Sequence, residues 1–176
     1  MLTNGKIRVR QVKEGDLDAL IPFVNNLEAR GEFLPRDMVS PHELRQQFNE
    51  NGMSTEDYER LLIVDKHDNI VGTVWHFKSV PYFNAREIGY VLFDMEKRGQ
   101  GIVSQAVSLV VSYLFQTTHL NRLEIRMDTR NKASEKVAIN CGFTKEGVSR
   151  GANYVWGEHV DMYIYALLRE EWRSKR

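Results

Sequence analysis

The chain has 176 residues, with 24 acidic and 24 basic side chains, so its formal net charge is zero. This length is typical of one domain, and a hydrophobic fraction of 42% is enough for a single core. A neutral chain lacks the basic excess that general nucleic-acid binding needs. We therefore expect a single domain over residues 1–176 with no nucleic-acid partner.

Two features of the sequence indicate the cellular compartment: the single cysteine, Cys141, and the polar N-terminus. One cysteine excludes an intrachain disulfide, which fits a reducing compartment. The first residues lack the apolar core of a signal peptide, and no apolar run is long enough to span a bilayer. We expect a cytoplasmic protein with no membrane partner, either a monomer or a homodimer.

Capping and turn residues divide the first half of the chain. Ser40 and Glu43 form a typical capping box at a helix start, and Gly52 suits the end of that helix. A further short helical turn is expected from Ser54. Apolar periodicity predicts the remaining elements. They are strands over 6–11, 60–65 and 70–77, and a helix over 16–27; the capping residues place the other helix over 41–51.

The second half alternates strands and helices and ends in a hairpin. Residues 147–157 are expected to form a polar connection, and residues 169–173 a solvated end. The order of elements, with antiparallel hairpins at both ends, predicts an α/β (α+β) fold with a mixed sheet flanked by helices. The expected elements are strands over 87–93, 123–128 and 160–166, a strand beginning at 143, and helices over 103–115 and 131–141.

A glycine loop, Arg98-Gly99-Gln100-Gly101, joins the strand over 87–93 to the helix that follows. Free backbone N–H groups and the positive end of that helix meet there, which suits an anion such as a phosphate. Three interpretations are open. The glycines can serve only a tight turn, form part of a dinucleotide fingerprint, or cradle the pyrophosphate of coenzyme A.

The dinucleotide fingerprint is incomplete in this chain. Ser104 stands where the third glycine belongs, although Asp128 ends the next strand about where a ribose-binding acid falls. Too little chain follows to complete a doubly wound parallel sheet. The lysine-containing phosphate loop is absent, because the sequence has no Gly-Lys-Ser/Thr.

Two motifs resemble the GCN5-related N-acetyltransferase family. Residues 98–101 match its Arg/Gln-x-x-Gly-x-Gly/Ala loop, and residues 131–143 match its later Asn-x-x-Ser…Gly-Phe motif. The likeness extends from residues 7–10 to residues 154–162 and is greatest with the ribosomal-protein N-terminal (Rim-type) branch. The family's final Gly/Ala is Val103 here, and its place in the apolar stripe of the helix predicts that it points to the core.

The resemblance implies an acetyl-CoA-dependent N-acetyltransferase, with a mostly antiparallel sheet whose central strands splay to hold the coenzyme. It implies direct transfer, in a ternary complex, to the α-amine of a protein N-terminus or an aminoacyl compound. No metal is expected. The residues implied to contact the coenzyme are Val91, Leu92, Phe93, Arg98, Gly99, Gln100, Gly101, Ile102, Val103, Ser104, Asn131 and Ser134.

Ser134 and Glu87 are the candidate catalytic residues. The resemblance implies that Ser134 protonates the departing thiolate; many relatives use a tyrosine one turn later, where this chain has Ala138. Glu87 is the candidate base for the ammonium, directly or through water. The alternatives are an ordinary helix serine and a solvated strand end. Some Rim-type enzymes have a glutamate just before the tyrosine that matches Tyr154, but Asn153 stands there and cannot accept a proton.

Aromatic side chains are the candidates for the acceptor site. Trp75 and Phe77 share one face of a strand, and Tyr154 can join them from a loop; packing in the core is the alternative. Two other functions stay open: the aromatic residues and Asn153 motivate the first, and Val103, Asn153 and Ala138 motivate the second. One is acetylation of a small aminoacyl toxin or antibiotic, and the other is a non-catalytic coenzyme A-binding module.

Overall fold

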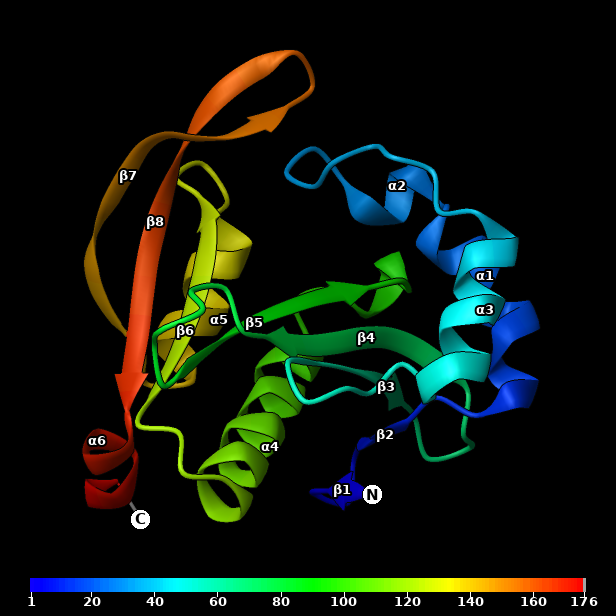
Figure 1. The fold of residues 1–176 in the computed structure, drawn as a ribbon, viewed down its shortest axis with the longest axis horizontal. Coiled ribbons are helices and arrows are strands. Elements are labelled where there is room, and N and C mark those ends of the chain that lie inside the picture. The colour runs from blue at the N-terminus through cyan, green and yellow to red at the C-terminus, as the bar shows by residue number, and fades with distance from the viewer. Residues whose placement is uncertain (176) are drawn as a thin grey trace.

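The computed structural model describes residues 1–175 and contains an eight-stranded sheet with helices on both faces (Figure 1). The strand order is β1-β2-β3-β4-β5-β6-β8-β7, and every neighbouring pair is antiparallel except β5 with β6. This arrangement confirms the predicted fold class. The strands are β1 (Leu2–Thr3), β2 (Arg8–Gln11), β3 (Tyr58–Val64), β4 (Ile70–Phe77), β5 (Ala85–Leu92), β6 (Arg122–Asp128), β7 (Thr144–Val155) and β8 (Glu158–Leu168). The α-helices are α1 (Leu17–Val24), α2 (Leu27–Arg30), α3 (Pro41–Asn51), α4 (Ile102–Thr117), α5 (Lys132–Asn140) and α6 (Arg169–Ser174), with short 3-10 helices η1 (Glu14–Asp16) and η2 (Met95–Lys97).

Helix α3 begins and ends where its capping residues predict. The Ser40 hydroxyl accepts a hydrogen bond from the backbone N–H of Glu43 at 3.4 Å. Gly52 follows the helix with a φ of 64°, a left-handed conformation that glycine adopts without strain. The helical turn expected from Ser54 does not form, because Ser54 makes an isolated β-bridge with Glu59 instead.

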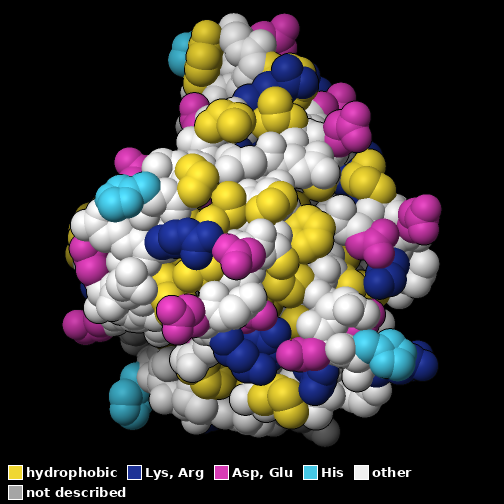
Figure 2. Space-filling model, turned by 90° about the vertical axis from the view of Figure 1, so that its right-hand side faces the viewer, with side chains coloured by type: hydrophobic (Ala, Val, Ile, Leu, Met, Phe, Trp, Pro, Cys, Tyr) yellow, Lys and Arg dark blue, Asp and Glu magenta, His cyan; other side chains and the backbone are white. Residues whose placement is uncertain are grey.

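Two buried clusters hold the helices against opposite faces of the sheet. On one face, α4 buries an apolar stripe that includes Val107 and Val110. On the other, α1 and α3 contribute Leu20 and Leu44 to a second cluster. Figure 2 looks onto the side formed by α1 and α3, where hydrophobic side chains gather across the middle and charged ones surround them. None of the helices within residues 1–175 is long and apolar enough to cross a membrane.

The C-terminal hairpin differs from the prediction. Residues 147–157, expected as a connection, mostly belong to β7, which pairs with β8. Two register shifts in this pairing interrupt the alternation that would have indicated a strand. The hairpin turns at Trp156 and Gly157, whose φ values of 56° and 86° are both positive, as a tight two-residue turn requires.

The end of the chain also differs from the prediction, because residues 169–173 lie within α6 and are not simply solvated. The Trp172 ring packs 5.4 Å from the Phe115 ring of α4. The Arg169 guanidinium donates to the backbone carbonyls of Phe115, Thr118 and Leu120. One of these carbonyls lies in the last turn of α4 and the other two follow the helix, so these hydrogen bonds join α6 to the end of α4.

Strands β5 and β6 pair only where they begin. Their parallel register runs from Ala85 opposite Arg122 to Glu87 opposite Glu124. Beyond that pair, β5 continues beside β4 and β6 continues beside β8, and Figure 1 shows the two strands diverging. The sheet therefore has an opening in its middle, between β5 on one side and β6 on the other.

A buried arginine ties the start of the chain to the β3–β4 turn. Arg10 is 7% exposed, and its guanidinium donates to the Asp16 carboxylate at 2.7 and 2.9 Å and to Asp68 at 3.1 Å. These hydrogen bonds hold the pKa of Asp16 below its usual value. The arginine thus joins β2, η1 and the β3–β4 turn through charged contacts.

We predict that Arg10→Met lowers the free energy of unfolding by about 3 kcal/mol at pH 7, because it leaves the Asp16 carboxylate poorly exposed and unpaired. The pKa of Asp16 is lowered in the folded state. The stabilisation by its pairing with Arg10 is therefore present above the unfolded-state pKa of about 3.9 and is lost as pH falls through the folded-state pKa. In urea unfolding, the difference in free energy of unfolding between the parent protein and Arg10→Met should therefore be smaller at pH 3 than at pH 7.

Lys13→Met is the matched control for this prediction. The Lys13 ammonium lies 3.6 Å from Asp68, but its side chain is 64% exposed. Exposed ion pairs contribute little, so we expect a loss below about 0.5 kcal/mol. Equal losses in the Arg10 and Lys13 variants would contradict the assigned role of Arg10.

Candidate active site

The glycine loop exposes backbone donors at the start of α4. Gly99 and Gly101 have φ values of 76° and 74°, in the left-handed region that favours glycine. Gly101 is the N-cap of α4 and provides no side-chain hydrogen bond, and the first helical acceptor is its carbonyl, bonded by Gln105 N–H at 3.0 Å. The N–H groups of residues 102–104 precede that bond and point out of the helix end. A loop of this geometry can hold an anion.

Three longer side chains in or next to the loop have partners elsewhere in the fold. Val103 packs against the core, where its place in the apolar stripe puts it. The Arg98 guanidinium donates to the Ala29 carbonyl of α2 at 3.1 Å. The Gln100 amide donates to the Glu96 carbonyl at 3.2 Å. The backbone N–H groups of residues 102–104 therefore remain as donors at this end of the helix.

The divergence of the strands leaves one edge of β5 without a strand partner. The Phe93 N–H donates to the Val71 carbonyl of β4 at 2.9 Å. Because successive N–H groups of a strand point in opposite directions, those of Leu92 and Tyr90 face the opening. Val91 and Phe93 pack with the cluster under α1 and α3, so their side chains leave the opening clear.

Helix α5 forms the other side of the opening. The Asn131 side chain caps this helix by accepting from Ser134 N–H at 3.0 Å. The Ser134 hydroxyl oxygen lies 2.8 Å from the phenol oxygen of Tyr90, across the opening. Burial raises the pKa of Tyr90, so its phenol stays protonated at neutral pH. Sequence reasoning missed this contact, although the alternation of Tyr90 with Ile88 places both side chains on the face that α4 and α5 cover.

Glu87 lies at the narrow end of the opening, beside two other charged side chains. Its carboxylate is 18% exposed and lies 3.4 Å from Arg126 Nε. Burial raises the pKa of Glu87, and the nearby Arg126 partly opposes that rise. Arg126 also donates at 2.9 Å to Glu124, which is 2% exposed and accepts from Arg122 as well, at 2.6 Å. A carboxylate with a raised pKa is a better proton acceptor than an ordinary surface glutamate.

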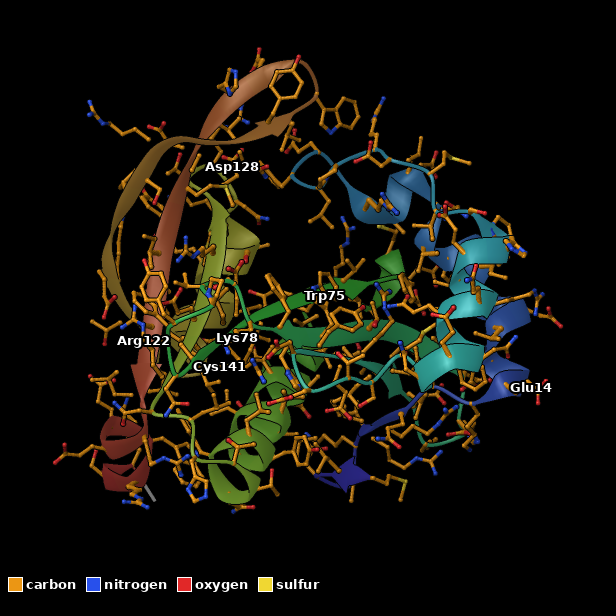
Figure 3. All side chains as sticks on the ribbon, in the orientation of Figure 1. Glu14, Trp75, Lys78, Arg122, Asp128 and Cys141 are labelled. Atoms are coloured by element: carbon orange, nitrogen blue, oxygen red, sulfur yellow. The ribbon has the colours of Figure 1, made fainter. Side chains whose placement is uncertain are left out.

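Two aromatic side chains lie on the same face of the sheet as Glu87. Trp75 lies against Gly89, whose missing side chain makes room, because an added Cβ would overlap the indole ring. Phe77 stands directly opposite Glu87 in the β4–β5 register. Figure 3 shows Trp75 on the β4–β5 side of the opening and Asp128 at the far end of β6. We call this surface the polar face; it consists of Trp75, Phe77, Glu87, Glu124, Arg126 and Asp128.

The β7–β8 hairpin carries Tyr154, the third aromatic residue predicted for the acceptor site. Tyr154 is 60% exposed, and its ring meets His159 edge-on at 5.1 Å, so it lies near the tip of the β7–β8 hairpin and not beside Trp75. Near the tip, Trp156 stacks with the guanidinium of Arg36 from the loop between α2 and α3. Figure 1 shows the hairpin tip and this loop approaching one another above the opening.

Known proteins share this sequence pattern and this fold. A family model for the acetyltransferase (GNAT) domain matches residues 6–144. The ribosomal-protein-serine acetyltransferase of Escherichia coli is 29% identical over 135 residues, covering 76% of this chain and 75% of that protein. The structure of the ribosomal L7/L12 alpha-N-protein acetyltransferase RimL with coenzyme A has a TM-score of 0.82 at 26% identity, covering 94% and 95% of the two chains. Spermidine N-acetyltransferase from Vibrio cholerae, solved with coenzyme A and spermine, has a TM-score of 0.83 over 97% and 99%, but at 19% identity it shows the fold alone.

We predict that Glu87→Gln raises the free energy of unfolding at pH 8, because an amide needs no desolvation of a charge. The pKa of Glu87 is raised in the folded state. Its contribution to stability is therefore fully present below the unfolded-state pKa of about 4.3 and is lost as pH rises through the folded-state pKa. The gain of the variant should therefore vanish near pH 4. Denaturant unfolding at both pH values measures it.

Glu158→Gln is the control for this measurement, because the Glu158 side chain is 73% exposed. It should change stability little at either pH. A Glu87→Gln protein that is less stable than the parent at pH 8 would show that the ion pair with Arg126 outweighs the burial of the carboxylate.

Proposed function

Because the chain belongs to the acetyltransferase (GNAT) family, we propose that it transfers the acetyl group of acetyl-CoA to the α-amine of a peptide or protein N-terminus. The family membership makes the chain an acetyl-CoA-dependent N-acetyltransferase, and the class of acceptor is what the proposal adds. The observation that carries it is the pairing of charges on the polar face.

Each carboxylate of the polar face has an arginine partner. Glu87 and Glu124 share Arg126, and Asp128 accepts from Arg130 at 2.7 Å. Paired carboxylates leave little net negative charge, so a polyamine with several ammonium groups finds few free partners there. A peptide N-terminus brings one ammonium together with backbone N–H and C=O groups, which can bond to both signs of charge. The similarity to ribosomal-protein acetyltransferases supports the same acceptor class.

The residues around the opening supply the groups that the reaction needs. The N–H groups of residues 102–104 would hold the pyrophosphate, and the Leu92 N–H would donate to the thioester oxygen as it becomes negative. Glu87 takes a proton from the ammonium, directly or through water, which frees the nitrogen lone pair. The nitrogen attacks the thioester carbon and a C–N bond forms. As the C–S bond breaks, Ser134 gives its hydroxyl proton to the sulfur, and the nitrogen then loses its second proton to solvent. Ser134 regains a proton from solvent, and Glu87 releases to solvent the proton that it took from the ammonium.

The acceptor class is tested by following free-thiol release from acetyl-CoA with a panel of amines. We expect kcat/KM for short peptides with a free N-terminal serine or alanine to exceed that for spermidine and for small aminoacyl compounds by at least tenfold, or about 1.4 kcal/mol. The same peptides with a blocked N-terminus and a free lysine side chain are the control and should be poor acceptors.

Two other outcomes would contradict the proposal and separate its alternatives. Turnover of the small aminoacyl compounds alone would favour a self-immunity or resistance type of enzyme. Tight binding of acetyl-CoA, measured by calorimetry, with no turnover of any amine would favour a non-catalytic coenzyme A-binding module.

A further inference from the structure

The contact between Tyr90 and Ser134 crosses the opening beyond the last pair of β5 and β6. Tyr90 lies three residues past Glu87 on β5, and Ser134 lies in the first turn of α5. The phenol oxygen is 2.8 Å from the Ser134 hydroxyl oxygen and 3.3 Å from the Ser134 carbonyl oxygen. Both side chains are partly buried, so water competes poorly for this hydrogen bond.

The direction of this hydrogen bond follows from the acidity of the two hydroxyls. A phenol is a stronger acid than an aliphatic alcohol and therefore the better donor, and the shorter of the two contacts is the one to the hydroxyl oxygen. Ser134 then accepts from Tyr90 and keeps its own proton for another partner. A serine in a helix commonly gives that proton to the carbonyl four residues before it, which would remove it from the chemistry.

We propose that Tyr90 is a positioning residue for the acetyl transfer: its phenol donates to the Ser134 hydroxyl oxygen and leaves the Ser134 proton free for the departing thiolate. This inference rests on the proposed function, because it requires Ser134 to be the proton donor. As Ser134 gives up its proton, negative charge grows on its oxygen, and a hydrogen bond to a charged oxygen is stronger than one to a neutral oxygen. The bond from Tyr90 therefore strengthens in the transition state, and its loss lowers kcat and leaves KM almost unchanged.

Kinetics of Tyr90→Phe, Ser134→Ala and the double variant test the proposal. We expect Tyr90→Phe to lower kcat by roughly tenfold to a hundredfold, with KM for acetyl-CoA and for the peptide changed by less than about twofold. In the Ser134→Ala background the same change should have no further effect, because the hydroxyl that Tyr90 serves is gone.

Tyr165→Phe is the matched control. The Tyr165 phenol donates at 2.8 Å to Glu135, the residue after Ser134 in α5, so it tethers the same helix without touching the serine hydroxyl. Its kcat should stay within about twofold of the parent. Tyr90→Phe and Tyr165→Phe both keep the aromatic ring, so we expect little loss of stability from either. Thermal unfolding of all variants shows whether any loss of activity comes from a loss of stability.

The outcomes separate this inference from the proposed function. Full kcat in Tyr90→Phe with a low kcat in Ser134→Ala would overturn the role of Tyr90 and leave Ser134 as the acid. A further loss when Tyr90→Phe is added to Ser134→Ala would also overturn it, because the two residues would act independently. Full kcat in Ser134→Ala would remove the proposed acid, and the role of Tyr90 with it.

Discussion

The parting of β5 from β6 after the pair of Glu87 and Glu124 is the constraint on which the rest of this molecule depends. A strand inside a sheet normally bonds on both edges, but here one edge of β5 has lost its neighbour, and the N–H and C=O groups on that edge need other partners. The glycine loop follows β5, and the first turn of α5 follows β6, so both border the space that the parting creates. In the reaction that we propose, the place where the strands diverge sets where the thioester and the incoming amine meet.

Two side-chain contacts define this opening at different depths. At its narrow end, Arg126 is shared between Glu124 and Glu87, so that a nearly inaccessible carboxylate and the candidate base are coupled through one guanidinium. Further along, Tyr90 meets Ser134 across the gap. The contact with Arg126 affects the pKa of Glu87. In our proposal, the contact with Tyr90 determines where the Ser134 proton points. The two proton transfers that we propose for Glu87 and Ser134 would therefore take place on opposite faces of β5, because side chains alternate along a strand.

Local signals in the sequence predicted much of the fold. The strand over 70–77 and the cap at Ser40 follow from residue patterns that act over short distances, and they are confirmed. The C-terminal hairpin was predicted, but residues 147–155 were expected as a connection and not as part of β7, because register shifts break the alternation and the glycines suggest a loop. At the candidate site, the glycine loop was visible as a linear motif, whereas the bond from Tyr90 to Ser134 was not. That bond joins residues from two elements, and only tertiary packing brings them together.

Amide hydrogen exchange with and without coenzyme A tests most directly the central claim that the free edge of β5 and the loop amides bind the coenzyme. The account predicts that coenzyme A slows exchange at Leu92 and at residues 102–104, while exchange in β2 and β3, away from the opening, stays unchanged. Gly101→Ala should reduce the protection of residues 102–104 at the same coenzyme concentration, because alanine in the left-handed conformation costs about 1–2 kcal/mol. Binding of coenzyme A that leaves Leu92 and the loop amides exchanging as fast as before would contradict the account.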